Sequence, residues 1–208
     1  MMTPLAYVYG LSLLLMTSGA CSAPPHLTLY QAETEWVDLR EWPSGYRTGT
    51  TDSHPATLEP ETIRKILLKV NYQESTLFAS LMGHTRPVFS EYQVTLLSSE
   101  LSRAFEQVLP EEIISFQVRN EENGNRHTKG FCFFQNNDFH LIIQELDQPD
   151  FYSQASEPRP MTIRWKFSPK EGQRLSSAHL EKNRGNPHWL IIPIKGKRSS
   201  HDVQQPSA

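Results

Sequence analysis

The chain has 208 residues, of which 38% are hydrophobic and 21% charged, and its 20 Lys and Arg against 23 Asp and Glu give a formal net charge of −3. This apolar content can build a core, so the composition excludes a chain that is disordered throughout. The mean hydropathy of −0.51 excludes a polytopic membrane protein, and the charge balance excludes a generally basic nucleic-acid binder. We therefore expect one globular domain and no nucleic-acid partner.

The first twenty residues have the pattern of a secretory signal. Residues 1–20 contain no charged side chain, and an apolar run from Leu5 to Met16 gives way to small residues. An apolar stretch of roughly 7–15 residues before small residues is typical of a cleaved signal peptide and is too short to span a bilayer. We expect residues 1–20 to be a signal peptide, followed by a tether and irregular N-terminal segment over residues 21–57.

A cysteine follows these small residues directly. The stretch Ser18-Gly19-Ala20-Cys21 resembles the lipobox of bacterial lipoproteins, although Ser18 stands where Leu is usual and the first residues lack Lys or Arg. The resemblance implies that Cys21 is the lipid attachment site and that acyl chains such as palmitate anchor the domain in a membrane. Ser22 in place of Asp implies the outer membrane of the cell envelope, facing the periplasm. A soluble secreted protein and a chance cysteine remain alternatives.

The second cysteine, Cys132, lies in the apolar run GFCFF. With Cys21 acylated it has no partner, so no disulfide is expected. We predict a small buried side chain with no role as a nucleophile.

The first predicted helix starts at Pro60, a residue that suits the first helical turn. Its apolar side chains recur at i, i+3, i+4 and i+7, which places them on one face: Ile63, Ile66, Leu67 and Val70.

The second predicted helix follows the capping box Ser90-Glu91-Tyr92-Gln93. Phe89 and Val94 flank this cap in the positions of a hydrophobic staple. Apolar residues then recur at helical spacing until Pro110 ends the run.

After Pro110 the apolar period changes from 3.6 to 2, which is typical of strands. We predict strands over residues 113–120, 128–135, 139–146, 161–167 and 188–194, with a tight hairpin turn at Asn123-Gly124 and an edge position for Pro193. Residues 35–39 predict one further short strand. The fold class is therefore α+β, with two helices packed on one face of a four- to five-stranded antiparallel sheet. We expect this single domain to span residues 58–198 and a flexible polar tail to span residues 199–208.

Motifs for catalysis or metal binding are not found. The histidines form no i, i+4 pair and no HExxH, so we expect no metal site, and the sequence has no P-loop, GxGxxG, GxSxG or CxxC. We expect no cofactor and no identifiable catalytic residue. This favours a domain that is not an enzyme, without deciding the matter.

Charge is distributed unevenly along the chain. Residues 21–156 carry 10 basic and 19 acidic side chains, a net of −9, whereas residues 157–208 carry 10 basic and 4 acidic ones, a net of +6. Such asymmetry is often found at a contact surface. The candidate contacts with an anionic partner are Arg164, Lys166, Lys170 and Arg174. The alternative is a solvated outer face.

Three classes of function follow. HPATLEPETIRKILLKVNY, the capped helix and the hairpin after it resemble bacterial lipoprotein domains of no assigned function, over residues 54–146. This resemblance implies a non-catalytic domain that binds or scaffolds an envelope protein complex or an anionic envelope polymer. A cell-wall hydrolase or other envelope enzyme with an acidic catalytic residue is the first alternative. A carrier of an apolar ligand is the second.

Overall fold

The computed structural model describes residues 27–43, 53–75, 84–122, 124–150, 165–177 and 186–194. The signal peptide, Cys21, Asn123, Arg164 and the polar tail lie outside these ranges. The strand predicted over residues 161–167 is described only from Trp165 onward.

Seven strands form the main sheet, in the order β1-β2-β5-β6-β7-β10-β9, and all neighbours pair antiparallel. Their bounds are Leu27–Gln31 for β1, Trp36–Glu41 for β2, Glu112–Arg119 for β5, Arg126–Gln135 for β6, Asp138–Pro149 for β7, Arg174–Ser176 for β9 and Asn186–Pro193 for β10. A second sheet of three strands has the order β4-β3-β8, formed by Arg86–Pro87, Asn71–Glu74 and Trp165–Phe167.

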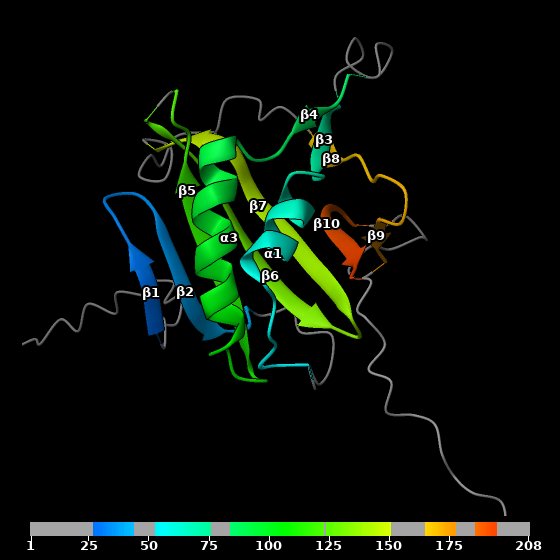
Figure 1. Ribbon diagram of the computed structural model, residues 1–208. Helices are drawn as coiled ribbons and strands as arrows, with labels where there is room; N and C mark the ends of the chain where they lie inside the picture. Colours follow the sequence, from blue (N-terminus) through cyan, green and yellow to red (C-terminus); the bar gives the residue numbers. More distant parts are fainter. Residues whose placement is uncertain are drawn as a thin grey trace, which may run out of the picture.

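Two helices of the described chain, α1 (Pro60–Leu67) and α3 (Glu91–Phe105), lie side by side on one face of the main sheet (Figure 1). The class is therefore α+β, as predicted. The predicted number of strands is wrong, because the main sheet has seven and not four to five. Strand β2 corresponds to the short strand predicted over residues 35–39. The strands that were not predicted are β1, from the segment that was expected to be irregular, and β9, which is only 3 residues long.

Pro193 also differs from its prediction. It ends β10, but β10 lies between β7 and β9 and is not an edge strand. The pairs between β10 and β9 run only from Asn186 to Ile191, so the proline lies beyond the paired stretch and its missing N–H removes no bond to β9.

The predicted cap of α3 is confirmed. Ser90 Oγ accepts a hydrogen bond from the Gln93 backbone N–H at 3.2 Å, and Gln93 Oε1 accepts one from the Ser90 N–H at 2.9 Å. Phe89 and Val94, the predicted staple, are both buried. The helix start is thus specified by local chemistry alone.

Between the helices and the sheet lies the main core. The predicted apolar face of α1 is buried there, and α3 contributes Leu97, Leu101 and Phe105 with no exposed surface. Alternate side chains of the central strands, among them Phe116 and Phe139, pack in the same core from the sheet side.

The opposite face of the sheet is also apolar in part. A second buried cluster contains Ile113, Phe131, Phe133, Ile142, Trp189 and Ile191. Strand β6 therefore buries side chains on both faces, as its sequence predicts. Cys132 lies on the helix side, fully buried, and burial raises the pKa of its thiol well above the usual value, which leaves it protonated and unreactive.

A buried histidine belongs to this second cluster. His140 is stacked on Phe133, with ring centroids 4.3 Å apart, and its Nδ1 accepts a hydrogen bond of 3.2 Å from the Trp189 indole. Burial lowers the pKa of His140 to about 4, so the ring is neutral near pH 7. Because the unfolded chain would bind this proton at about pH 6.5, the neutral ring stabilises the fold above that pH and this contribution is lost as the pH falls toward 4.

Candidate functional site

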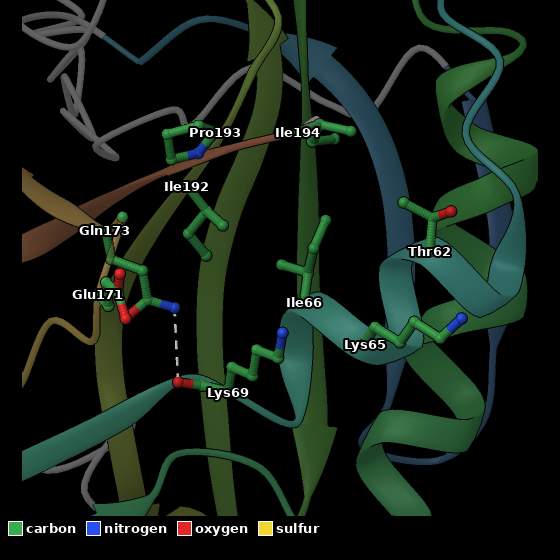
Figure 2. A pocket seen from close by; sticks show the side chains of 10 residues that line it. Thr62, Lys65, Ile66, Lys69, Glu171, Gln173, Ile192, Pro193 and Ile194 are labelled. Atoms are coloured by element: carbon green, nitrogen blue, oxygen red, sulfur yellow. Dashed lines mark hydrogen bonds between the residues drawn. The ribbon is translucent and has the colours of Figure 1, made fainter. Parts of the chain in front are cut away.

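A groove of about 600 Å³ lies between α1 and the C-terminal end of β10 (Figure 2). Its walls come from three separate parts of the chain: α1 with the residues directly after it, the turn before β9, and the end of β10. The residues that line it are Thr62, Lys65, Ile66, Lys69, Glu171, Gly172, Gln173, Ile192, Pro193 and Ile194.

The first wall of the groove is one side of α1 and the residues directly after it. Thr62, Lys65, Ile66 and Lys69 stand at i, i+3, i+4 and i+7, so they form a single stripe next to the stripe that enters the core. Ile66 belongs to both stripes and is 8% exposed. Ile66, which belongs to the apolar face that packs α1 on the sheet, thus also lines the groove.

The facing wall is a turn held by its own hydrogen bonds. Gln173 Oε1 accepts from the Lys170 backbone N–H at 2.8 Å, and the Gln173 N–H donates to the Lys170 carbonyl at 2.9 Å. Gly172 has φ +81°, a conformation that side chains disfavour. The Gln173 amide also donates to the Lys69 carbonyl at 3.5 Å, which joins the turn to the end of α1.

The floor of the groove is apolar. Ile192 is buried, and Ile194 is half-buried just beyond the end of β10. Asn137, in the turn between β6 and β7, holds this segment: its backbone carbonyl accepts from the Ile194 N–H at 3.0 Å, and its side-chain amide donates to the Ile194 carbonyl at 2.5 Å. Apolar floor, polar rim and volume all match the usual features of sites for small or extended ligands.

The rim carries both signs of charge. Lys65 Nζ lies 3.6 Å from a Glu61 carboxylate oxygen, an exposed pair of little energetic weight. Within the described part of the chain, Lys69 on one wall and Glu171 on the other have no ion-pair partner within 4.0 Å. The groove therefore offers a ligand the ammonium group of Lys69 and the carboxylate of Glu171, with Lys65, already near Glu61, beside them.

Of the four predicted basic contacts, three lie within the described residues. Lys166 is exposed on β8, between the buried Trp165 and Phe167. Lys170 is exposed in the turn beside the groove. Arg174 is already paired, with its Nη2 2.6 Å from Asp138 Oδ2. None of these three described residues lines the groove, although Lys170 and Arg174 directly flank its turn, residues 171–173.

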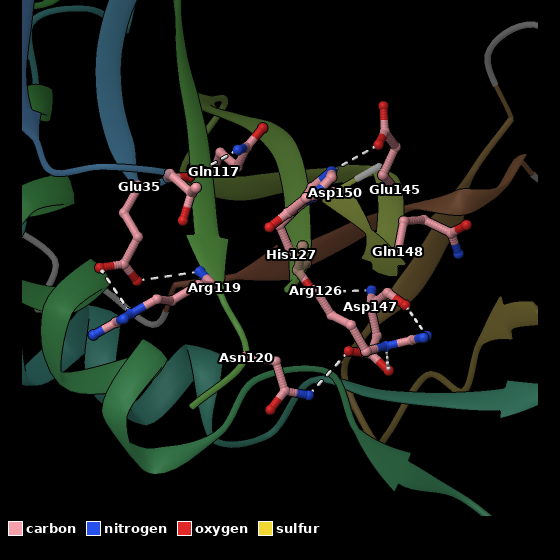
Figure 3. Close-up of polar contacts among 12 residues, drawn as sticks. Glu35, Gln117, Arg119, Asn120, Arg126, His127, Glu145, Asp147, Gln148 and Asp150 are labelled. Carbon is pink, nitrogen blue, oxygen red and sulfur yellow. Dashed lines mark hydrogen bonds and ion pairs between the residues drawn. The ribbon is translucent and has the colours of Figure 1, made fainter. Parts of the chain in front are cut away.

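Glu35, the most buried carboxylate of the described chain, lines a smaller cavity of about 210 Å³. One of its oxygens accepts from the Tyr92 hydroxyl at 2.8 Å. The other accepts from the Arg119 backbone N–H at 3.1 Å (Figure 3). The hydrogen bond to Glu35 raises the pKa of Tyr92. These contacts attach the turn between β1 and β2 to α3 and β5, which gives the carboxylate a structural role.

A second polar cluster connects β6 with the end of β7 (Figure 3). His127 lies between two carboxylates, with Nδ1 2.6 Å from Asp150 Oδ1 and Nε2 2.8 Å from Glu145 Oε2. Carboxylates only accept hydrogen bonds, so both ring nitrogens donate when the imidazole is protonated. The hydrogen bond to Glu145, and then that to Asp150, raises the pKa of His127 against the opposing effect of burial.

This arrangement predicts a pH-dependent contribution to stability. Below about pH 6.5 His127 is charged in both the folded and the unfolded chain, and its bonds stabilise the fold fully; the contribution is lost as the pH rises through the raised pKa. We expect His127→Gln to lower the melting temperature most near pH 5.5, by the equivalent of about 1–3 kcal/mol, and progressively less at higher pH. A difference between wild type and variant that is constant from about pH 5.5 to 9 would contradict this role.

The described residues contain neither a cluster of metal ligands nor a helix that spans a membrane. No group of three His, Cys, Asp or Glu side chains in these ranges is arranged to hold a metal ion. None of the helices described is long and apolar enough to cross a bilayer.

Comparison with known proteins gives no relative: no family model, no curated protein and no solved structure matches this chain. The groove itself was not predicted from the sequence. The helical stripe from Thr62 to Lys69 was a visible signal, because two lysines on it flank an isoleucine, but nothing local connects this stripe with residues 171–173 or 192–194.

Proposed function

We propose that this chain is an envelope lipoprotein, anchored by a lipid on Cys21, whose domain binds another envelope component and performs no catalysis. The observation that carries the binding role is the groove beside α1, with its isoleucine floor and charged rim. The signal-like segment and the lipobox-like Ser18-Gly19-Ala20-Cys21 support the anchor, and Ser22 in place of Asp supports a position on the outer membrane facing the periplasm.

An anchored domain needs little intrinsic affinity. Tethering confines the domain and its partner to the same surface, and the effective concentration of a short tether is in the millimolar range. Lys166 and Lys170 are exposed and available to an envelope protein complex or an anionic envelope polymer, and such a contact would weaken as salt shortens the Debye length.

A carrier of an apolar ligand is the second candidate, and the apolar floor of the groove favours it. The enzyme alternative has less support. A catalytic acid must be free to exchange a proton with a substrate, whereas Glu35 is engaged by Tyr92 and by the backbone of Arg119.

The anchor is tested by metabolic labelling with an alkyne fatty acid. We expect wild-type protein to be labelled and to sediment with membranes, because acylation needs the Cys21 thiol. Cys21→Ala should be unlabelled and should either remain unprocessed or be released. Cys132→Ala, which removes the other cysteine, is the matched control and should be labelled like wild type. Absence of label from the wild-type protein would refute the lipoprotein assignment.

The binding role is tested by pull-down from detergent-solubilised envelopes. Wild type should recover one defined component, and Ile194→Asp, which places a charge on the groove floor, should lose it. Equal recovery by wild type and Ile194→Asp would show that the groove is not the binding site.

A further inference from the structure

The two walls of the groove differ in charge. Lys65 and Lys69 lie on the α1 side, and Glu171 lies on the opposite turn; the Lys65 ammonium is directed away from that turn (Figure 2), with its Nζ 3.6 Å from Glu61. Both lysines and the glutamate are exposed, and within the described residues neither Lys69 nor Glu171 has a protein partner that neutralises it. A ligand that satisfies both walls must carry a negative and a positive group.

The space between these charges is apolar. Ile66 from α1 and Ile192 from β10 point toward one another across the floor, and Ile194 extends the apolar surface along the end of β10 (Figure 2). Aliphatic side chains of this kind suit a flexible hydrocarbon chain, which gains free energy in proportion to the apolar area that it removes from water. A fully polar ligand would leave this floor unmatched.

We propose that the groove binds one acyl chain of a zwitterionic phospholipid. The chain lies on Ile66, Ile192 and Ile194, the phosphate faces Lys65 and Lys69, and the headgroup ammonium faces Glu171. This inference rests on the proposed function, because it names the occupant of the groove that we assign as the binding site.

Charge matching selects this occupant over its nearest alternatives. A purely anionic headgroup would satisfy the lysines but would leave Glu171 facing like charge, which is unfavourable. An uncharged apolar ligand would gain nothing from any of the three charged side chains. The lipid anchor would hold the domain at a membrane surface, where phospholipid is always within reach.

The test is a titration of full-length protein, purified in a non-ionic sugar detergent, followed by native mass spectrometry. The probes are lysophosphatidylethanolamine and lysophosphatidylglycerol with the same acyl chain, so that they share the chain and the phosphate and differ in the headgroup, an ethanolamine with its ammonium against an uncharged glycerol. We expect the ethanolamine lipid to bind about three- to fivefold more tightly, the effect of one exposed ion pair. Glu171→Gln should abolish this preference.

Further variants separate the contribution of the two lysines from that of the apolar floor. The double variant Lys65→Gln, Lys69→Gln should weaken both lipids to a similar extent, because both carry the phosphate. Ile194→Asp should abolish binding of both. Lys166→Gln removes an exposed lysine that does not line the groove and should bind like wild type.

The other possible results contradict the occupant, the binding site or the proposed function. Equal or tighter binding of the glycerol lipid to wild type would refute the zwitterionic occupant, and lipid binding that survives Ile194→Asp would refute the site. If neither lipid binds but the groove-dependent pull-down succeeds, the lipid inference fails while the proposed binding function stands. If both fail, the proposed function fails as well.

Discussion

Phe105→Ala should lower the free energy of unfolding by about 3–5 kcal/mol, the usual result of truncating a buried aromatic ring. Phe105 has no exposed surface, and its ring centroid lies 5.8 Å from that of Phe139 and 6.0 Å from that of His54. It therefore joins α3 both to the sheet and to the segment before α1. Chemical denaturation monitored by tryptophan fluorescence gives the difference directly.

A truncation on the surface provides the control. Leu68, just after α1, is 40% exposed, and Leu68→Ala should change stability by no more than about 0.5 kcal/mol. Since small domains are stable by about 5–15 kcal/mol, the two variants are easily distinguished. Equal effects from Phe105→Ala and Leu68→Ala would mean that the core is not organised around α3.

Gly130→Ala should also be strongly destabilising, although it adds only one methyl group. An added Cβ at this position in β6 would lie 2.3 Å from the Ile142 backbone oxygen on β7 and 3.0 Å from the Phe116 ring. A backbone oxygen in a paired strand cannot move away like a flexible side chain, so the sheet must deform. We expect a loss of about 1–3 kcal/mol or more, measured by thermal or chemical denaturation.

Gly124→Ala is the matched control for this second variant. Apart from its chain neighbours, no atom of the described residues lies within 4 Å of the Cβ that it would add, so stability should remain within about 0.5 kcal/mol of wild type. A stable, fully folded Gly130→Ala protein would show that β6 and β7 are not packed as closely as described.

The parts of the fold that were predictable are those specified by neighbours in the sequence. The cap at Ser90 needs only Gln93 three residues later, and the apolar face of α1 needs only the helical period. The size of the sheet depends on pairing between distant segments. Strand β2 pairs with β5, which begins at Glu112, and no local pattern in β2 identifies that partner.

The groove and the cluster around His127 could not be predicted from the sequence for the same reason. The groove is assembled from α1, the turn before β9 and the end of β10, and α1 precedes the other two parts by about one hundred residues or more. His127 was considered only as a metal ligand, whereas its partners Glu145 and Asp150 reach it through irregular pairing of β6 with β7. Bulges of this kind redirect side chains without a clear signal in the sequence.

Photo-crosslinking in intact cells can show whether the protein is a membrane-anchored domain that binds through the groove beside α1. A photoreactive amino acid at Ile194 should give one discrete adduct, because that side chain lines the groove. The same group at Ser99, exposed on α3, should give none. An adduct from Ile194 that disappears with Cys21→Ala would support both the site and the anchor. Equal crosslinking from Ile194 and Ser99, or none from Ile194, would contradict the binding role of the groove.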